Sequence, residues 1–153
     1  MTTENVIPML IDSYMAMIKN SLGSNLFRNV YAIVNGVKID ITNNGELSCA
    51  YFVSSILLIL KLIKEVHVTV SGTIKDLESS GWSEISKPRT GSIVIWEEKD
   101  FGNNSSHKHI GFYIGNQQAI SNDFRKGYPI QHALEYENRK VEKILWNSRL
   151  ENK

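Results

Sequence analysis

The sequence predicts an α+β fold, because helical patterns come first along the chain and short strands follow. Residues 49–64 are apolar on nearly every side of a helix, so this helix must be buried, and a sheet is its expected partner. From residue 92 onward, apolar runs alternate with short polar turns, which is typical of an antiparallel sheet. We therefore expect a buried helix that begins at Cys49 and packs on an antiparallel sheet.

The first part of the chain predicts a helix followed by a hairpin. Residues 4–22 carry apolar side chains at spacings of three and four, which indicates an amphipathic helix, and Pro8 fits its first turn. Asn35 and Gly36 then separate two β-rich runs, which is a strong short-range hairpin signal. An irregular extended arm is the alternative. We group the helix and the hairpin as residues 4–42.

The only cysteine lies at the start of the most apolar helix. Ser48 is a good N-cap for a helix over residues 49–64, and the preceding residues 43–45 have turn chemistry. A thiol in the first turn feels the positive end of the helix dipole, which lowers its pKa from about 8.5. Free cysteine is also a common buried apolar residue, so simple packing is the alternative. Cys49 is therefore a candidate nucleophile.

The second half of the chain predicts one short helix and then strands. Residues 73–80 have a helical pattern that ends at Gly81. Strands are expected at residues 92–96, 109–115, 119–122 and 140–146, which together form a β-meander over residues 92–146. No internal repeat or linker interrupts the chain. We therefore expect a single domain over residues 1–153.

Composition excludes several classes of function. The 42% hydrophobic and 22% charged content is ordinary for a globular domain. The net charge is +1 and no basic block is present, so nucleic-acid binding has no electrostatic support. A single cysteine excludes an internal disulfide and a multi-thiolate zinc site, and it fits a reducing compartment.

Localisation is predicted from two absences. The longest apolar run, residues 50–63, contains two serines and Lys61, and it is too short to span a bilayer. The first five residues lack the pattern of a secretory signal. We expect a cytoplasmic protein with no membrane partner, and release by lysis or a non-classical route is the alternative. The oligomeric state is left open.

A nucleophilic thiol needs a base, and the chain has four histidines. His109 opens an apolar strand in which alternation places His109, Gly111 and Tyr113 on one face. The absence of a side chain at Gly111 leaves room for another backbone or a substrate. A solvated or locally hydrogen-bonded histidine is the alternative. His67 and His132 have no pattern beyond that of exposed loop residues.

Two histidines two residues apart raise the question of a metal. His107 and His109 would share one face of a strand, as some metal ligands do. A metal site needs at least a third ligand, and the sequence nominates none. We therefore expect no metal and no cofactor, with His107 either at the border of a cleft or in the polar loop that begins at residue 100.

Three motifs together resemble the NlpC-like cell-wall cysteine peptidases, which belong to the small papain-like hydrolases along with the CHAP amidases. The motifs are Ser48-Cys49, the Pro88–Trp96 turn and strand, and His109-Ile-Gly-Phe-Tyr-Ile-Gly-Asn with the strand up to Asn122. The resemblance covers about half of the chain. Cysteine before histidine also differs from the order in the circularly permuted lipid-acyltransferase branch.

The resemblance implies a catalytic Cys49, a general base at His109 and a third polar residue that orients the imidazole. The family pattern places Ser121 at the third position, where NlpC-like enzymes often have histidine. Asn122 has the amide carbonyl that papain-like and CHAP sites use, so we expect Asn122, with Ser121 as the alternate. Ser48 departs from the Asp that commonly precedes the cysteine, which makes the substrate class less certain than the fold.

The function implied is a cysteine-dependent hydrolase that cleaves peptide or peptidoglycan-type amide bonds through a Cys-His-polar triad. Its substrate partner would be a peptide or a peptidoglycan fragment. Two alternatives remain open: a catalytically degenerate papain-like binding module, and an acyltransferase that passes the acyl group to an amine instead of water.

Overall fold

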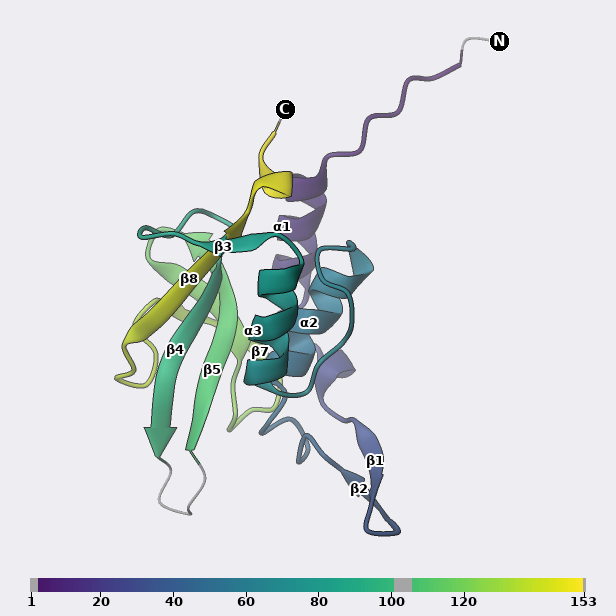
Figure 1. The fold of residues 1–153 in the computed structure, drawn as a ribbon, viewed down its shortest axis with the longest axis vertical. Coiled ribbons are helices and arrows are strands. Elements are labelled where there is room, and N and C mark those ends of the chain that lie inside the picture. The colour runs from purple at the N-terminus through teal and green to yellow at the C-terminus, as the bar shows by residue number, and fades with distance from the viewer. Residues whose placement is uncertain (1–2, 101–105, 153) are drawn as a thin grey trace.

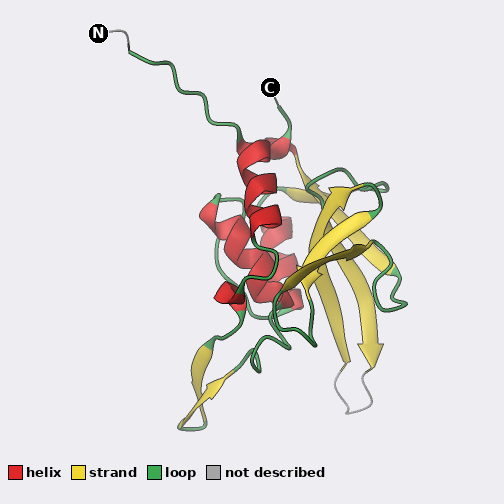
Figure 2. Ribbon diagram, turned by 180° about the vertical axis from the view of Figure 1, so that it is seen from behind, coloured by secondary structure: helices red, strands yellow, loops and turns green. Residues whose placement is uncertain are grey.

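A computed structural model describes residues 3–100 and 106–152, and over these ranges helices cover one face of an antiparallel sheet (Figure 1). A small β-hairpin projects away from this body, as both ribbon views show (Figure 2). The α+β class and the packing of the Cys49 helix on the sheet are confirmed.

The helices differ from expectation mainly at their ends. Helix α1 (Leu10–Asn20) begins after Pro8 rather than at residue 4, and the apolar side chains before it remain exposed. Helix α2 (Cys49–Ile59) begins at the expected residue but ends before residue 64, because the chain turns at Lys61 with a positive φ of 56°. Helix α3 (Val70–Ser79) begins three residues early, where the Thr69 side chain caps it by accepting the Gly72 N–H.

The main sheet has the strand order β3-β8-β4-β5-β6-β7. Its strands are β3 (Trp82–Glu84), β4 (Ile93–Asp100), β5 (Ser106–Gly115), β6 (Gln118–Asn122), β7 (Pro129–Ala133) and β8 (Val141–Asn147). Strands β4, β5 and β6 pair in sequence order as expected, but the expected last strand, β8, pairs with β4 on its other side, and β3 pairs with β8 at the edge of the sheet. The sequence pattern did not predict β3 or β7. Residues 101–105 of the expected polar loop lie outside the described residues.

The sheet separates two clusters of buried side chains. The larger cluster lies between the helices and the sheet and includes Phe52, Leu57, Ile110 and Phe112. The smaller cluster lies on the opposite face and contains these buried side chains: Val94, Trp96, Tyr113, Ala119 and Tyr136. The alternation expected along 109–115 is therefore present, with the isoleucines and Phe112 facing the helices.

The projecting hairpin consists of β1 (Tyr31–Val34) and β2 (Val37–Asp40). The turn at Asn35 and Gly36 has positive φ at both residues, as the tight turn of a two-residue hairpin requires. Asp40 holds the base of the hairpin by accepting the backbone N–H groups of Val30 and Thr42.

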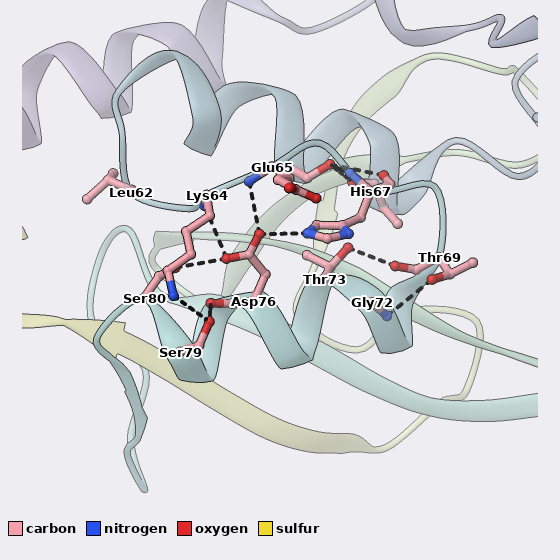
Figure 3. Close-up of polar contacts among 12 residues, drawn as sticks. Leu62, Lys64, Glu65, His67, Thr69, Gly72, Thr73, Asp76, Ser79 and Ser80 are labelled. Atoms are coloured by element: carbon pink, nitrogen blue, oxygen red, sulfur yellow. Dashed lines mark hydrogen bonds and ion pairs between the residues drawn. The ribbon is translucent and has the colours of Figure 1, made fainter.

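The loop between α2 and α3 is fixed by a buried carboxylate (Figure 3). Asp76 accepts the backbone N–H groups of Lys64 and Glu65, and it lies 2.7 Å from Nε2 of His67. On the other side of the loop, Ser54 of α2 exchanges hydrogen bonds with the backbone of His67. His67 is therefore not the exposed loop residue that the sequence suggested.

The electrostatics of Asp76 agree with this anchoring role. Burial alone would raise the pKa of Asp76, but the hydrogen bonds from His67, the Lys64 backbone and Ser80 outweigh it and lower the pKa. The carboxylate is thus stabilised by the fold in its charged form. Its contribution to stability is complete above the ordinary carboxyl pKa of 3.8 and is lost as the pH falls below that value.

We predict that Asp76→Asn lowers the free energy of unfolding by about 1–3 kcal/mol at neutral pH, because buried donors lose their charged acceptor. The measurement is denaturant unfolding of both proteins at neutral and acidic pH, where the difference should shrink. Glu78→Gln, which removes an exposed carboxylate from the same helix, is the matched control. Equal stabilities of wild type and Asp76→Asn at neutral pH would contradict the anchoring role.

Candidate functional site

A cleft of about 950 Å³ lies at the N-terminal end of α2. Its walls come from the loop before α2, the start of α3 with the preceding loop, and the outer part of β4 and β5. Cys49 and His109 both line it, together with Tyr136 and Arg139. The structure therefore brings the two principal candidates, which are far apart in sequence, to one cavity.

Cys49 is the first residue of α2 and is half-buried. Its sulfur interacts with the backbone N–H of Ile110, which directly follows His109 on β5. Ser48 occupies the N-cap position, but its hydroxyl donates to the Arg28 carbonyl at 3.3 Å and does not cap the helix. The N–H groups of Cys49 and Ala50 instead lie close to the sulfur.

The pKa of the Cys49 thiol is raised, whereas the position of Cys49 in the sequence predicted that it would be lowered. Burial raises the pKa of Cys49, and the backbone N–H groups of Ile110 and Ala50 and the charge of Arg139 oppose the rise without cancelling it. The expected lowering by the helix dipole is therefore wrong, because loss of solvent outweighs the helix terminus. Cys49 is held as a neutral thiol at neutral pH.

His109 is buried, with 6% of its surface exposed. Its Nε2 atom lies 2.8 Å from the Ser121 hydroxyl, and its ring stacks on Tyr136 at 4.6 Å between centroids. Gly111 makes the approach of Ser121 possible, because a Cβ there would meet the Ser121 Cβ at 2.7 Å. The space that Gly111 leaves is thus occupied by β6 and by Trp96, and not by substrate.

Asn122 does not contact the imidazole. Its Nδ2 donates to the Gly45 carbonyl at 2.7 Å, and its Oδ1 makes no hydrogen bond within the described residues. Strand alternation turns Asn122 toward the face opposite Ser121. The residue that orients His109 is therefore Ser121, the alternate, while Asn122 anchors the loop that leads into Cys49.

The Ser121 hydroxyl also contacts a second histidine. It lies 2.6 Å from Nε2 of His132, whose Nδ1 lies 2.6 Å from the Ala133 carbonyl. His132 is on β7, and its ring lies tilted against the ring of Tyr136. The expectation of an exposed loop residue is therefore wrong for His132 as well.

The imidazole of His109 is held neutral. Burial lowers its pKa well below the ordinary 6.5, and the charges of Arg139 and His132 add to this. No hydrogen bond occupies its Nδ1 among the described residues, and none joins it to the thiol. Such contacts are often long before a substrate binds. The cleft thus contains a protonated thiol and a neutral imidazole.

Arg139 supplies positive charge to the cleft. The side chain is buried, and its Nη1 donates to the carbonyls of His107 and Glu97 at 2.9 and 3.3 Å. Its charge acts on both Cys49 and His109. A cation at this position favours any negative charge that develops on the sulfur or on a bound acyl group.

His107 is exposed on β5, and residues 3–100 and 106–152 contain no cluster of three or more His, Cys, Asp or Glu side chains that could hold a metal. In the same ranges no helix has the length and apolar character needed to cross a bilayer.

The sequence did not identify three residues of the site: His132, Tyr136 and Arg139. His132 and Ile130 lie on the same face of a short strand. The register of β7 on β6, which places Ala119 opposite His132, brings His132 to Ser121, and no local pattern indicates this register. Tyr136 and Arg139 lie in the connection between β7 and β8, where no periodic pattern indicates which side chains turn inward.

We predict that titration of the Cys49 thiolate, followed by its ultraviolet absorbance, gives a midpoint above the ordinary thiol pKa of 9.0. Burial makes the charged form costly, so little thiolate should be present at neutral pH. Cys49→Ser, which has no thiol, gives the baseline. A midpoint near or below neutral pH would contradict the structure and restore the dipole argument.

The two neighbours on β6 should have separable effects. Ser121→Ala should change the NMR signals of the His109 ring, because it removes the hydroxyl that is hydrogen-bonded to Nε2. Asn122→Ala should leave those signals as in wild type and should lower the free energy of unfolding by about 1–3 kcal/mol, because the Gly45 carbonyl loses its donor. NMR of the histidine rings and denaturant unfolding of both variants test this, and the reverse pattern in the His109 signals would make Asn122 the orienting residue.

Comparison with known proteins adds no identity: no family model matches the chain, and no curated protein matches it in sequence. We therefore infer function from the geometry of the cleft.

Proposed function

We propose that the cleft is the active site of a papain-like cysteine hydrolase that cleaves peptide or peptidoglycan-type amide bonds. The observation that carries the proposal is that Cys49 and His109 both line one cleft, with Nε2 of His109 2.8 Å from the Ser121 hydroxyl. A nucleophile, a base and an orienting group in this order are the parts that thiol-based acyl transfer needs. The resemblance of the three motifs to NlpC-like peptidases supports the same assignment.

The first half of the proposed reaction forms a thioester. As the Cys49 sulfur attacks the amide carbonyl carbon, the thiol proton passes to Nδ1 of His109, and the carbonyl π electrons move onto oxygen. The backbone N–H of Cys49 at the start of α2 helps to stabilise this oxyanion. The oxyanion then re-forms the carbonyl, the carbon–nitrogen bond breaks, and His109 gives its proton to the leaving amine.

The second half releases the acyl group. His109, again neutral, takes a proton from a water molecule as the water oxygen attacks the thioester carbon. The carbon–sulfur bond breaks, the sulfur recovers the proton, and the product leaves as a carboxylic acid that ionises in solution. A resting neutral pair suits this cycle, because each turnover restores the protonated thiol and the neutral imidazole, and no buried ion must be held between turnovers.

The raised thiol pKa also supports a second candidate, a binding module on the same scaffold. A thiol kept protonated by burial is what a site without chemistry would contain. An acyltransferase remains the third candidate, since an amine could replace water in the second half. The experiment below separates all three.

We predict that Cys49→Ala lowers amide hydrolysis by about 10³-fold or more while the protein stays folded, because no other side chain replaces the nucleophile. The assay uses peptide mixtures and peptidoglycan fragments in heavy-oxygen water, and mass spectrometry detects new carboxylates. Ser55→Ala, a change on the same helix away from the thiol, is the control, and thermal unfolding checks the fold.

Each candidate predicts a different result. Heavy oxygen in the product and a thioester trapped on Cys49 support the hydrolase. Amide products formed only with added amines indicate the transferase. Turnover that persists in Cys49→Ala, or fragment binding without any turnover, would overturn the hydrolase.

A further inference from the structure

Three hydrogen bonds in series connect the active-site imidazole to the backbone of β7. They join His109 Nε2 to Ser121 Oγ, Ser121 Oγ to His132 Nε2, and His132 Nδ1 to the Ala133 carbonyl, at 2.8, 2.6 and 2.6 Å. We infer that His132 is a positioning residue that fixes the tautomer of His109 through the Ser121 hydroxyl. Its effect on activity rests on the proposed function, but the tautomer itself does not.

The Ala133 carbonyl determines which atom donates in each of the three hydrogen bonds. A backbone carbonyl can only accept a hydrogen bond, so Nδ1 of His132 must carry a proton. Burial lowers the pKa of His132, although the Ala133 carbonyl and the charges of Asp123 and Glu137 oppose this, so the ring is neutral at neutral pH. In a neutral ring with a proton on Nδ1, Nε2 is an acceptor.

The acceptor on His132 then determines what Ser121 does. The serine hydroxyl has one proton, and the contact with His132 requires that this proton points to His132 Nε2. The contact with His109 can then use only a lone pair of the serine oxygen. His109 must therefore donate, so its proton is on Nε2 and its Nδ1 has a free electron pair. That is the atom that the proposed mechanism needs as the base.

Without His132 the serine would be ambiguous. A hydroxyl can donate to or accept from an imidazole nitrogen, so Ser121 alone would allow both tautomers of His109. In the second tautomer Nδ1 already carries a proton, so it cannot accept the thiol proton until its own proton has left. His132 removes this ambiguity. Ser121 therefore acts toward the imidazole only as a hydrogen-bond acceptor.

His132 is itself held in place on two sides. Its ring lies 4.3 Å from the ring of Tyr136 and 5.6 Å from the ring of Trp96, between centroids. Trp96 is fixed in turn by donating from Nε1 to the Leu134 carbonyl at 2.8 Å. The residue that sets the tautomer is therefore part of a packed aromatic group on the sheet face that also carries His109.

The first test is a nitrogen-detected NMR experiment on the isotope-labelled wild-type protein at neutral pH. The nitrogen shifts of a histidine ring distinguish a protonated nitrogen from an unprotonated one. We expect His109 to be protonated on Nε2 only, and His132 on Nδ1 only. A proton on Nδ1 of His109, or on Nε2 of His132, would overturn the inference whether or not the protein is an enzyme.

The second test uses a matched pair of variants. His132→Gln retains an acceptor oxygen that can reach Ser121, whereas His132→Leu has none. His109 should keep its single tautomer in His132→Gln and should become a mixture in His132→Leu. If His132→Leu does not fold, Ser121→Ala also breaks the hydrogen-bonded link between His132 and His109. The tautomers measured in the wild-type protein test the inference in either case.

Kinetics complete the test. His132→Leu should lower kcat about 10-fold, with His132→Gln close to wild type and KM unchanged in both. Equal kcat in the two variants would overturn the positioning role. Correct tautomers in a protein without turnover would leave the inference intact and refute only the proposed function.

Discussion

The hydrogen bond between His109 and Ser121 is the interaction on which the site depends. It joins two neighbouring strands, and it exists only because Gly111, opposite Ser121 in the sheet, has no side chain. With any Cβ at that position the strands would have to separate, and the imidazole would lose its partner. The register of β5 on β6 thus positions His109 near Ser121, and the start of α2 contributes Cys49 to the same cleft.

Burial decides the charge state of this site. The helix terminus, the Ile110 N–H and Arg139 all favour a thiolate, yet loss of solvent keeps the pKa of Cys49 raised. The same cause keeps His109 neutral. A neutral thiol and a neutral base are less reactive at rest than an ion pair, but they need no stabilisation in the absence of substrate. In the proposed mechanism, reactivity comes from proton transfer during the attack on the substrate.

Local signals in the sequence were reliable where the structure is local. The Asn35-Gly36 turn, the start of the helix at Cys49 and the alternation along β5 all follow from a few neighbouring residues. The family pattern also placed Ser121 at the third position, and Asn122 was preferred to it because papain-like and CHAP sites use an amide carbonyl. In the structure Asn122 supports the Gly45 loop, a role that only the three-dimensional contact reveals.

The parts that the sequence did not predict depend on long-range pairing or on competition between effects. His132 reaches Ser121 through the register of β7 on β6, which no short pattern encodes. Ser48 has the right identity for an N-cap, but the Arg28 carbonyl binds its hydroxyl instead. The thiol pKa could not be read from helix position, because the opposing burial is a property of the whole fold.

The most direct test of the account is whether the Cys49 sulfur and the His109 ring can be bridged by one small molecule. Dibromoacetone carries two reactive carbons on either side of a single carbonyl, so it links only a thiol and an imidazole that face each other. Peptide mapping of the treated native protein should show Cys49 joined to His109, and Ser121→Ala should reduce the yield. A protein alkylated on Cys49 alone, or linked to a different residue, would contradict the account.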